Sequence, residues 1–493
     1  YTFSYFIITF KAVKERWGID YFNDERVRRF AGWLCRFFGP FDKRFNAYTW
    51  PAIGNSVLPQ NQGEYLLCYA SELAEGDPLR EESLAVWEKT APLCRPSEHY
   101  PLVMAAMAPL KMPDARCQVP GKARSNLKPE TRNLKPLSSE VMDEVGVAMR
   151  HRHTEADESY LFQKIGFAKD HYEADETAFN WYAKGTPFCM EYGTYTSEAS
   201  VGGAHNVVEI PDEDALRRGY LAAHLFTGAA DYTHCEVPVT LKLLWGKVRT
   251  FAEAENKDGK IDRRKTPYFY IGDKNPVGPK AWKVRKMLFI KPDCIVLFDR
   301  VYGQVPHRYN LHFTGTDIRR EGQRITGKGR FDLDLLAFVQ HPAEFDMELG
   351  ELIPNVHSGC DQDRRNHSQN YLRIYNTRDG IYRTLIFAKE HGRDLRLQSV
   401  GSCGIKISAP EYTDYVFMHD DLVDELAGDI RFKGRVGMMR RRADGSVMAC
   451  VPDGDLIAAF GTALEGRGPW SFNLDASGRI VMHGGPPRNI SKS

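Results

Sequence analysis

The feature that most constrains the fold is a single change in the period of the hydrophobic pattern along the chain. Up to about Leu110, apolar residues recur at helical spacing, and Asn23-Asp24 followed by Gly39-Pro40 predicts the start and the end of one helix through Phe38. From Gly146 onward, short β-branched and aromatic runs are separated by turn residues. The pattern therefore predicts a helical N-terminal part followed by a large antiparallel β-sheet part.

Local signals place further elements on both sides of this change. We expect three more helical stretches, over residues 64–73, 82–90 and 99–110. Two apolar runs, Met287–Ile290 and Cys294–Phe298, flank the turn Lys291-Pro292-Asp293 and predict a β-hairpin.

The length of 493 residues exceeds what one hydrophobic core serves, so two or three domains are expected. We predict an α+β multidomain chain, with a helical part over residues 1–117, a Pro- and Lys-rich linker over 118–142 and an antiparallel β-sandwich over 143–493. A separate C-terminal sheet subdomain is expected from about residue 400.

The charge balance limits the classes of partner. With 66 basic and 65 acidic residues the net charge is +1, which gives no global attraction to nucleic acid or to a membrane surface, so an acidic substrate must be held locally. No stretch approaches the roughly 20 apolar residues of a membrane span. The ten cysteines form no CxxC pair. Because the chain has no initiator Met and no signal-peptide pattern, we interpret it as a mature or truncated fragment.

The densest cluster of ionisable and aromatic residues lies within residues 169–185. If its first half is extended, strand alternation places His171, Glu173 and Asp175 on one face. Glu191 and His205 follow in the next polar stretches. Glu173, Glu191 and His205 together offer the mixed oxygen and nitrogen ligands that suit a divalent metal.

Three motifs in this region resemble the heparinase II/III-like polysaccharide lyases. That family carries His-x-His-x-Asp-x-x-x-Phe, then an acidic residue before Gly, then Ala-His-Asn at the start of a strand. The matching stretches here keep the same order, with Glu173 replacing the second histidine, and they are His171–Phe179, Glu191-Tyr192-Gly193 and Ala204-His205-Asn206. Supporting matches are Gly146–Arg150 and Leu288–Asp293 with Phe298-Asp299-Arg300, and a weaker one is Tyr48–Ser56.

The resemblance implies a fold, a cofactor and a set of roles. It implies that the helical part belongs to an (α/α)-toroid, incomplete at its N-terminus, and that the protein is periplasmic or extracellular. It implies a divalent ion (Zn, Mn or Ca) at Glu173, Glu191 and His205, with His171 as catalytic histidine. The catalytic tyrosine would be Tyr192 or Tyr195, and Tyr1 lies in a Tyr-rich stretch similar to the one that supplies the family's second tyrosine.

The implied reaction is β-elimination on a uronate-containing acidic polysaccharide. A base removes the C5 proton, the neighbouring carboxylate must be neutralised, and an acid protonates the leaving oxygen at C4. His171 would act as base or neutraliser, Tyr195 or Tyr192 as base or acid, and Tyr1 as acid. The metal would organise the loops, since elimination consumes no water. Arg150 is a candidate for binding the substrate carboxylate and Trp50 for stacking on a sugar.

Structural explanations compete with each of these roles. Glu173 and Glu191 could be solvated carboxylates, Tyr192 and Tyr195 could pack a sheet, and Trp50 could belong to the helical core. At the level of function, a uronate C5-epimerase and a glycan-binding protein without turnover are the alternatives to a lyase. Neither the polysaccharide nor the oligomeric state follows from the sequence.

Overall fold

The structure is a computed structural model. It describes residues 2–45, 47–51, 63–90, 136–143, 145–153, 156–166, 174–191, 202–210, 213, 218–239, 281–303, 305–352, 368–375, 379–477, 479–484 and 489–492. None of the helices in these ranges is long and apolar enough to cross a membrane.

The N-terminal part is mainly helical where it is described. It contains α1 (Thr2–Trp17), α2 (Glu25–Phe37), α3 (Gly63–Ser71) and α4 (Pro78–Thr90). The predicted start of α2 is confirmed, because the Asp24 side chain accepts a hydrogen bond of 2.9 Å from the Arg26 amide and so caps the helix. The stretch predicted over 64–73 is helical up to Ser71 and the one over 82–90 is helical throughout, while the one over 99–110 lies outside the described residues.

The rest of the described chain is β-structure arranged in five sheets. A small one pairs β1 (Phe41–Asp42) with β2 (Ala47–Tyr48). A five-stranded sheet has the order β3-β4-β5-β6-β7, with the bounds Glu140–Met142, Gly146–His151, Ser159–Lys164, Phe179–Ala183 and Thr186–Cys189. A four-stranded sheet has the order β17-β18-β13-β8, with the bounds Asp346–Leu352, Gln369–Tyr375, Arg308–Phe313 and Val208–Glu209.

The two largest sheets form the centre and the C-terminal end of the molecule. The eight-stranded sheet has the order β14-β15-β16-β19-β12-β11-β10-β9, with the bounds Gly315–Glu321, Arg324–Gly329, Leu333–His341, Ile381–Glu390, Cys294–Tyr302, Ala281–Ile290, Ala230–Val239 and Tyr220–Phe226. The nine-stranded sheet contains β20 to β28, with the bounds Arg396–Val400, Gly404–Ser408, Tyr412–Ala427, Ile430–Arg442, Val447–Ala459, Thr462–Glu465, Trp470–Leu474, Ile480–Gly484 and Asn489–Lys492. The predicted hairpin is confirmed as β11 and β12, which are antiparallel with Ile290 opposite Cys294.

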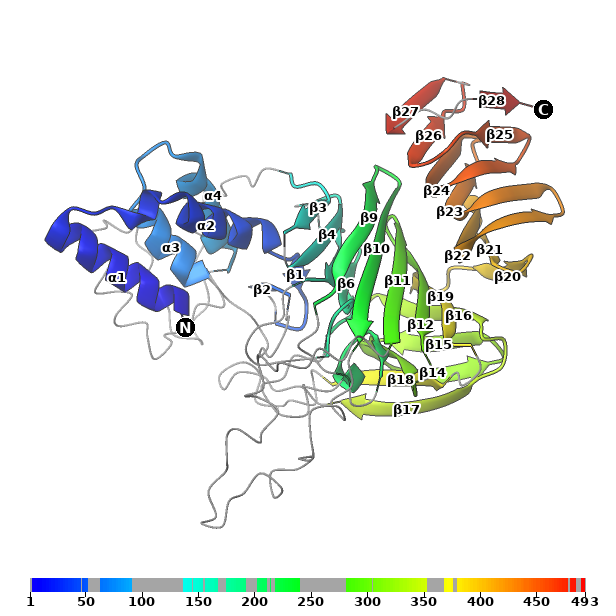
Figure 1. Cartoon of the computed structure of the whole chain (residues 1–493), viewed down its shortest axis with the longest axis horizontal. Helices are drawn as coiled ribbons and strands as arrows, with labels where there is room; N and C mark the ends of the chain where they lie inside the picture. Colours follow the sequence, from blue (N-terminus) through cyan, green and yellow to red (C-terminus); the bar gives the residue numbers. More distant parts are fainter. Residues whose placement is uncertain are drawn as a thin grey trace, which may run out of the picture.

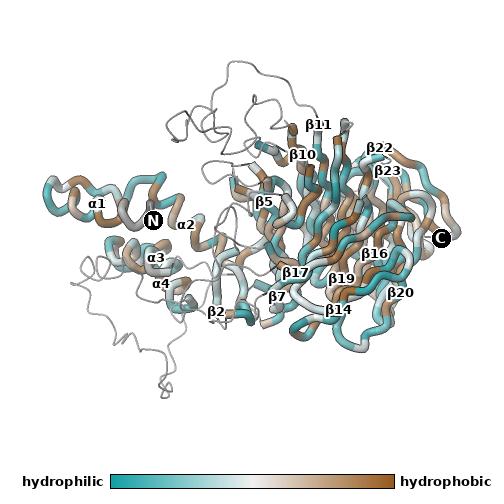
Figure 2. The backbone as a smooth tube through the Cα atoms, turned by 90° about the horizontal axis from the view of Figure 1, so that it is seen from below, coloured by the Kyte–Doolittle hydropathy of each residue, from teal (hydrophilic) through white to brown (hydrophobic). Residues whose placement is uncertain are grey.

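The sheets stack in layers beside the helices (Figure 1). The helices pack on the outer face of the five-stranded sheet, where Phe37 meets Phe162 at 4.7 Å between ring centres. The other face of that sheet and the four-stranded sheet cover one side of the eight-stranded sheet. The nine-stranded sheet covers its opposite side. Apolar segments run through the interior of this stack (Figure 2).

The central strands β11 and β12 of the eight-stranded sheet are buried on both faces, which explains their uninterrupted apolar runs. On β11, Met287 and Phe289 point into the core shared with the five- and four-stranded sheets. Their neighbours Leu288 and Ile290 point into the core shared with the nine-stranded sheet. A strand with water on one side would alternate apolar and polar residues, whereas this one is apolar at every position from 287 to 290.

The prediction of an N-terminal helical toroid is wrong. The described residues contain four α-helices, which pack as a layer against the five-stranded sheet, and most of the described chain is strand. The physical reason is that helical periodicity reveals only that each helix has one apolar face. It does not show whether that face packs against further helices, as in a toroid, or against a sheet. The domain boundaries stay a prediction, since most of the linker assigned to 118–142 lies outside the described residues.

Candidate functional site

Glu191 and His205 meet at the end of the five-stranded sheet. Glu191 follows β7, and His205 directly follows the short 3-10 helix Gly202–Ala204. The two side chains are 6% and 3% exposed, and Oε2 of Glu191 is hydrogen-bonded to Nδ1 of His205. The structure thus brings together two of the three side chains predicted to bind metal.

Asn206 fixes the carboxylate of Glu191 from the next position in the chain. Its backbone amide donates to Oε1 of Glu191 at 3.0 Å, so both carboxylate oxygens are engaged. Its side-chain amide donates to the carbonyl of Phe179 at 2.8 Å, and its Oδ1 accepts from the backbone amide of His312 at 2.7 Å. Because Asn206 is fully buried, each of these contacts is shielded from water.

The backbone of Glu191 is held as firmly as its side chain. Its amide donates to Oδ1 of Asn180 on β6 at 2.8 Å, and its carbonyl accepts from Nε2 of Gln369 on β18 at 3.3 Å. Asn180 and Gln369 are both buried. Side chains from two sheets therefore position this residue.

His312 is a second buried histidine close to this pair. Its Nε2 lies 3.1 Å from the carbonyl of Gly203, which identifies Nε2 as the protonated nitrogen. Burial, with smaller contributions from the positive charge of neighbouring groups, lowers the pKa of His312 to about 3. The ring therefore stays neutral at physiological pH and serves as a hydrogen-bond donor to the turn that carries His205.

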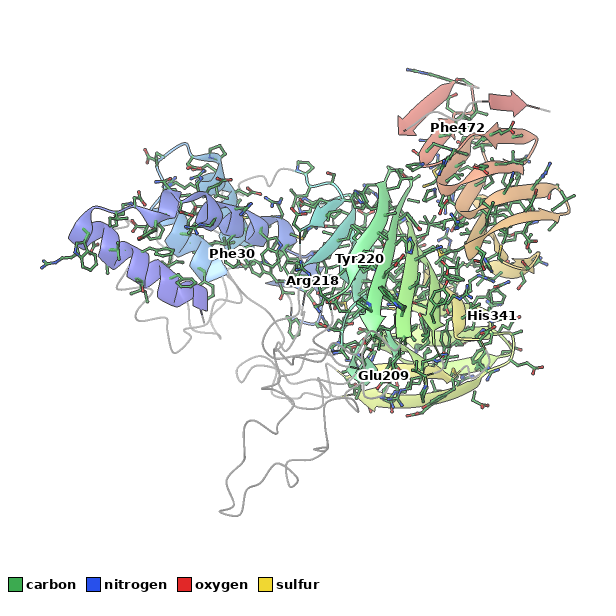
Figure 3. The ribbon with its side chains drawn as sticks, viewed as in Figure 1. Phe30, Glu209, Arg218, Tyr220, His341 and Phe472 are labelled. Carbon is green, nitrogen blue, oxygen red and sulfur yellow. The ribbon has the colours of Figure 1, made fainter. Side chains whose placement is uncertain are left out.

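Two arginines lie against the same turn on the outer face of the four-stranded sheet. A Cβ atom at Gly203 would lie 2.9 Å from Nη2 of Arg373 and 3.4 Å from Nη2 of Arg308. Arg308 is paired with Glu209 on β8, and Arg373 donates to Glu348 on β17 at 2.9 Å. Figure 3 shows Glu209, which lies on the edge strand β8 of this sheet. Cationic groups are thus held against the turn that carries His205.

The environment of Glu209 shows how strongly this face is charged. Burial acts to raise the pKa of Glu209, but hydrogen bonds from Arg308 and Asn310 and the charges of Arg308 and Arg373 outweigh burial and hold the pKa below its usual value. The carboxylate is therefore ionised at physiological pH. Arg373 also packs over the ring of Tyr371, with 4.2 Å between its guanidinium carbon and the ring centre.

Arg150 and Trp50 are buried and bonded to the protein itself. Arg150 has a side chain that is 1% exposed, forms an ion pair of 2.7 Å with Glu158 and donates to the carbonyls of Arg36 and Phe38. Trp50 is 2% exposed and its Nε1 donates to the carbonyl of Leu34 at 2.9 Å. Both side chains therefore donate hydrogen bonds to carbonyls in α2 or just after it. Contact with a substrate stays a prediction for each.

The remaining predicted site residues lie outside the described part of the chain. These are Tyr1, His171, Glu173, Tyr192 and Tyr195. Their assignment as catalytic and metal-binding residues therefore stays a prediction.

The described donors fit a metal site in part. Glu191 and His205 converge with one carboxylate and one imidazole, which suits Zn or Mn. Within the described ranges, no group of three or more His, Cys, Asp or Glu residues is placed to hold an ion. A complete site would thus need a further donor from elsewhere in the chain, and Glu173 is the candidate from the sequence.

Comparison with solved structures identifies the fold. A heparinase III structure matches with a TM-score of 0.53 and 12% identity, covering 84% of this chain and 58% of that one. The heparan sulfate lyase HepC from Pedobacter heparinus matches with a TM-score of 0.45 and 9% identity, covering 75% of this chain and 50% of that one. No protein-family model and no curated protein matches the sequence.

The chain has a heparinase-like lyase fold, which confirms the resemblance at the level of the fold. It spans about half the length of the solved structures it matches. The match therefore assigns the fold, and the activity, substrate and partners of the whole protein are proposed below.

Proposed function

We propose that the protein is a polysaccharide lyase that cleaves a uronate-containing acidic polysaccharide by β-elimination. The observation that carries this proposal is the meeting of Glu191 with His205 on a heparinase-like fold. These residues come from two of the three sequence motifs that resemble the heparinase II/III-like lyases, and 14 positions separate them in the chain. The third motif supplies His171 as the proposed catalytic histidine.

The charged face beside the turn supports an acidic substrate. Arg308 and Arg373 lie against Gly203, two residues before His205. The Glu348 side chain that pairs with Arg373 is 41% exposed, and the Arg373 side chain is 17% exposed. A substrate carboxylate or sulfate would compete for the guanidinium of Arg373 with Glu348, which also accepts hydrogen bonds from Tyr371 and Tyr375.

The proposed metal ion would be held by Glu191, His205 and Glu173. It would supply a fixed positive centre that organises the surrounding backbone. Its role would be structural, because β-elimination needs no activated water. The proton transfers would fall to His171 and to Tyr192 or Tyr195, with Tyr1 as the further candidate acid.

An assay with a panel of acidic glycans tests the activity. The expected result is an increase in ultraviolet absorbance from the unsaturated uronate product with at least one uronate polysaccharide, and its loss in His171→Ala. Solvent deuterium incorporated at C5 without cleavage would instead indicate an epimerase. Binding without product, retained in His171→Ala, would indicate a glycan-binding protein. Either outcome contradicts the lyase proposal.

Elemental analysis tests the metal separately. We expect roughly one divalent ion per chain in the purified protein and much less in Glu191→Gln and His205→Ala. Glu158→Gln is the matched control, since it neutralises another buried carboxylate, paired with Arg150. Equal metal content in Glu191→Gln and in wild type would refute the assignment of Glu191 as a ligand.

The periplasmic or extracellular location is proposed on the same basis. A polymeric acidic substrate is available outside the cytoplasm. Fractionation of the source cells, followed by detection of the protein in each fraction, tests this proposal.

A further inference from the structure

Arg285 is a fully buried arginine on β11 that none of the proposed roles uses. It stands opposite Asp299 on β12 in the register of the hairpin. Its Nε donates to Oδ1 of Asp299 at 2.6 Å, and its Nη2 donates to Oδ2 at 3.2 Å. The pair is bidentate, with side chains that are 1% and 4% exposed. Asp299 thus satisfies one edge of the guanidinium and leaves Nη1 available for other partners.

The remaining nitrogen of Arg285 joins two segments that are distant in the sequence. Nη1 donates to the carbonyl of Thr177 at 2.8 Å and to the carbonyl of Asn206 at 2.6 Å. Thr177 lies two residues before β6, which carries Asn180, and Asn206 follows His205 directly. One guanidinium therefore fixes the distance between the two segments that frame the candidate site.

Asn206 transmits this constraint to the site. Its carbonyl is held by Arg285, while its amide donates to the Glu191 carboxylate that is paired with His205. Thr177 has a φ of +72°, a left-handed conformation that a β-branched residue adopts only when its surroundings impose it. The hydrogen bond from Arg285 to the Thr177 carbonyl is one contact that holds this conformation.

We propose that Arg285 is a positioning residue for the candidate site: through the carbonyls of Asn206 and Thr177 it sets the alignment of Glu191 with His205. The proposal rests on the function proposed above for that pair. A guanidinium is required because only a planar fork can serve a carboxylate and two carbonyls at once, whereas a lysine ammonium is a point charge. The role is indirect, since Arg285 contacts the backbone beside the site.

The chain offers a matched control for a merely structural ion pair. Arg440 on β23 donates to both oxygens of Asp414 on β22, at 2.6 Å and 2.7 Å, and the side chains are 7% and 0% exposed. The pair is bidentate, buried and cross-strand like that of Arg285. It lies in the nine-stranded sheet, whereas Glu191 follows β7 of the five-stranded sheet, which packs on the other side of the eight-stranded sheet.

The experiment compares Arg285→Lys with Arg440→Lys in the full chain. Both substitutions keep the positive charge and lose the fork, so both should lower the urea midpoint. Only Arg285→Lys should speed amide hydrogen exchange in the peptides that contain Thr177 and Asn206, by on the order of tenfold for the loss of one charge-assisted hydrogen bond. Only Arg285→Lys should also lower metal content and kcat while leaving KM for the glycan unchanged.

The exchange measurement decides the proposal even if no glycan is cleaved. Unchanged exchange at Asn206 in Arg285→Lys would overturn it, and so would an equal acceleration in Arg440→Lys. If exchange changes as expected but the wild type has no lyase activity, the proposed function fails while the positioning role of Arg285 stands.

Discussion

Acidification should destabilise the protein through His312. The ring is fully buried, and burial lowers its pKa from 6.5 to about 3. Between these two values the unfolded state binds a proton that the folded state excludes. The contribution of His312 to the free energy of unfolding is therefore fully present above pH 6.5 and decreases as the pH falls toward about 3. Lowering the pH from about 7 to about 5 should therefore reduce the free energy of unfolding by about 2 kcal/mol, at about 1.36 kcal/mol for each pH unit below the unfolded-state pKa.

The assay is urea unfolding at both pH values, followed by tryptophan fluorescence. The variant His312→Gln serves as comparison, because its amide can still donate to the carbonyl of Gly203 but does not titrate. The variant should be less stable at pH 7 and should lose about 2 kcal/mol less than wild type on acidification. An equal loss of the free energy of unfolding in wild type and variant between the two pH values would refute a role of His312 in the acid sensitivity.

Three further substitutions test the fold. Trp50→Phe should cost about 1–3 kcal/mol by urea unfolding, because it removes a buried hydrogen bond, while glycan binding measured by calorimetry stays the same if Trp50 has only a structural role. Gly185→Ala should lower the thermal midpoint by several degrees, since φ is +70° and a Cβ atom would lie 2.1 Å from the Ala156 carbonyl oxygen; an unchanged midpoint would contradict the backbone placement. Asp414→Asn should cost about 3–5 kcal/mol by leaving the Arg440 charge buried without its ionised partner, and a loss below about 1 kcal/mol would argue against that pair.

The elements predicted correctly are those defined by contacts near in sequence. The cap at Asp24 marks the start of α2, and the turn at Pro292 marks the hairpin of β11 and β12. The same turn also sets the register of the hairpin, because pairing Ile290 with Cys294 places Arg285 opposite Asp299. An arginine and an aspartate facing each other within apolar strands are a detectable signal for a buried ion pair.

What the sequence could not supply depends on contacts between distant segments. The order of the eight-stranded sheet places β19 between β12 and β16, which no local pattern reveals. The burial of Arg150 follows from carbonyls on α2 and just after it, at a distance of more than 100 residues in the chain. The convergence of Glu191 with His205 was predicted from motif order alone, whereas the supporting roles of His312 and Gln369 require the four-stranded sheet to be placed first.

The nine-stranded sheet buries one face of the eight-stranded sheet. It seals the face that carries Leu288, Ile290, Val296 and Phe298, which are at most 1% exposed. A protein shortened to end before Arg396 would expose that apolar surface to water. Two copies would then be expected to associate through this surface. Attempts to express a smaller version of the protein should therefore keep the C-terminal strands, or replace these residues with polar ones to avoid self-association.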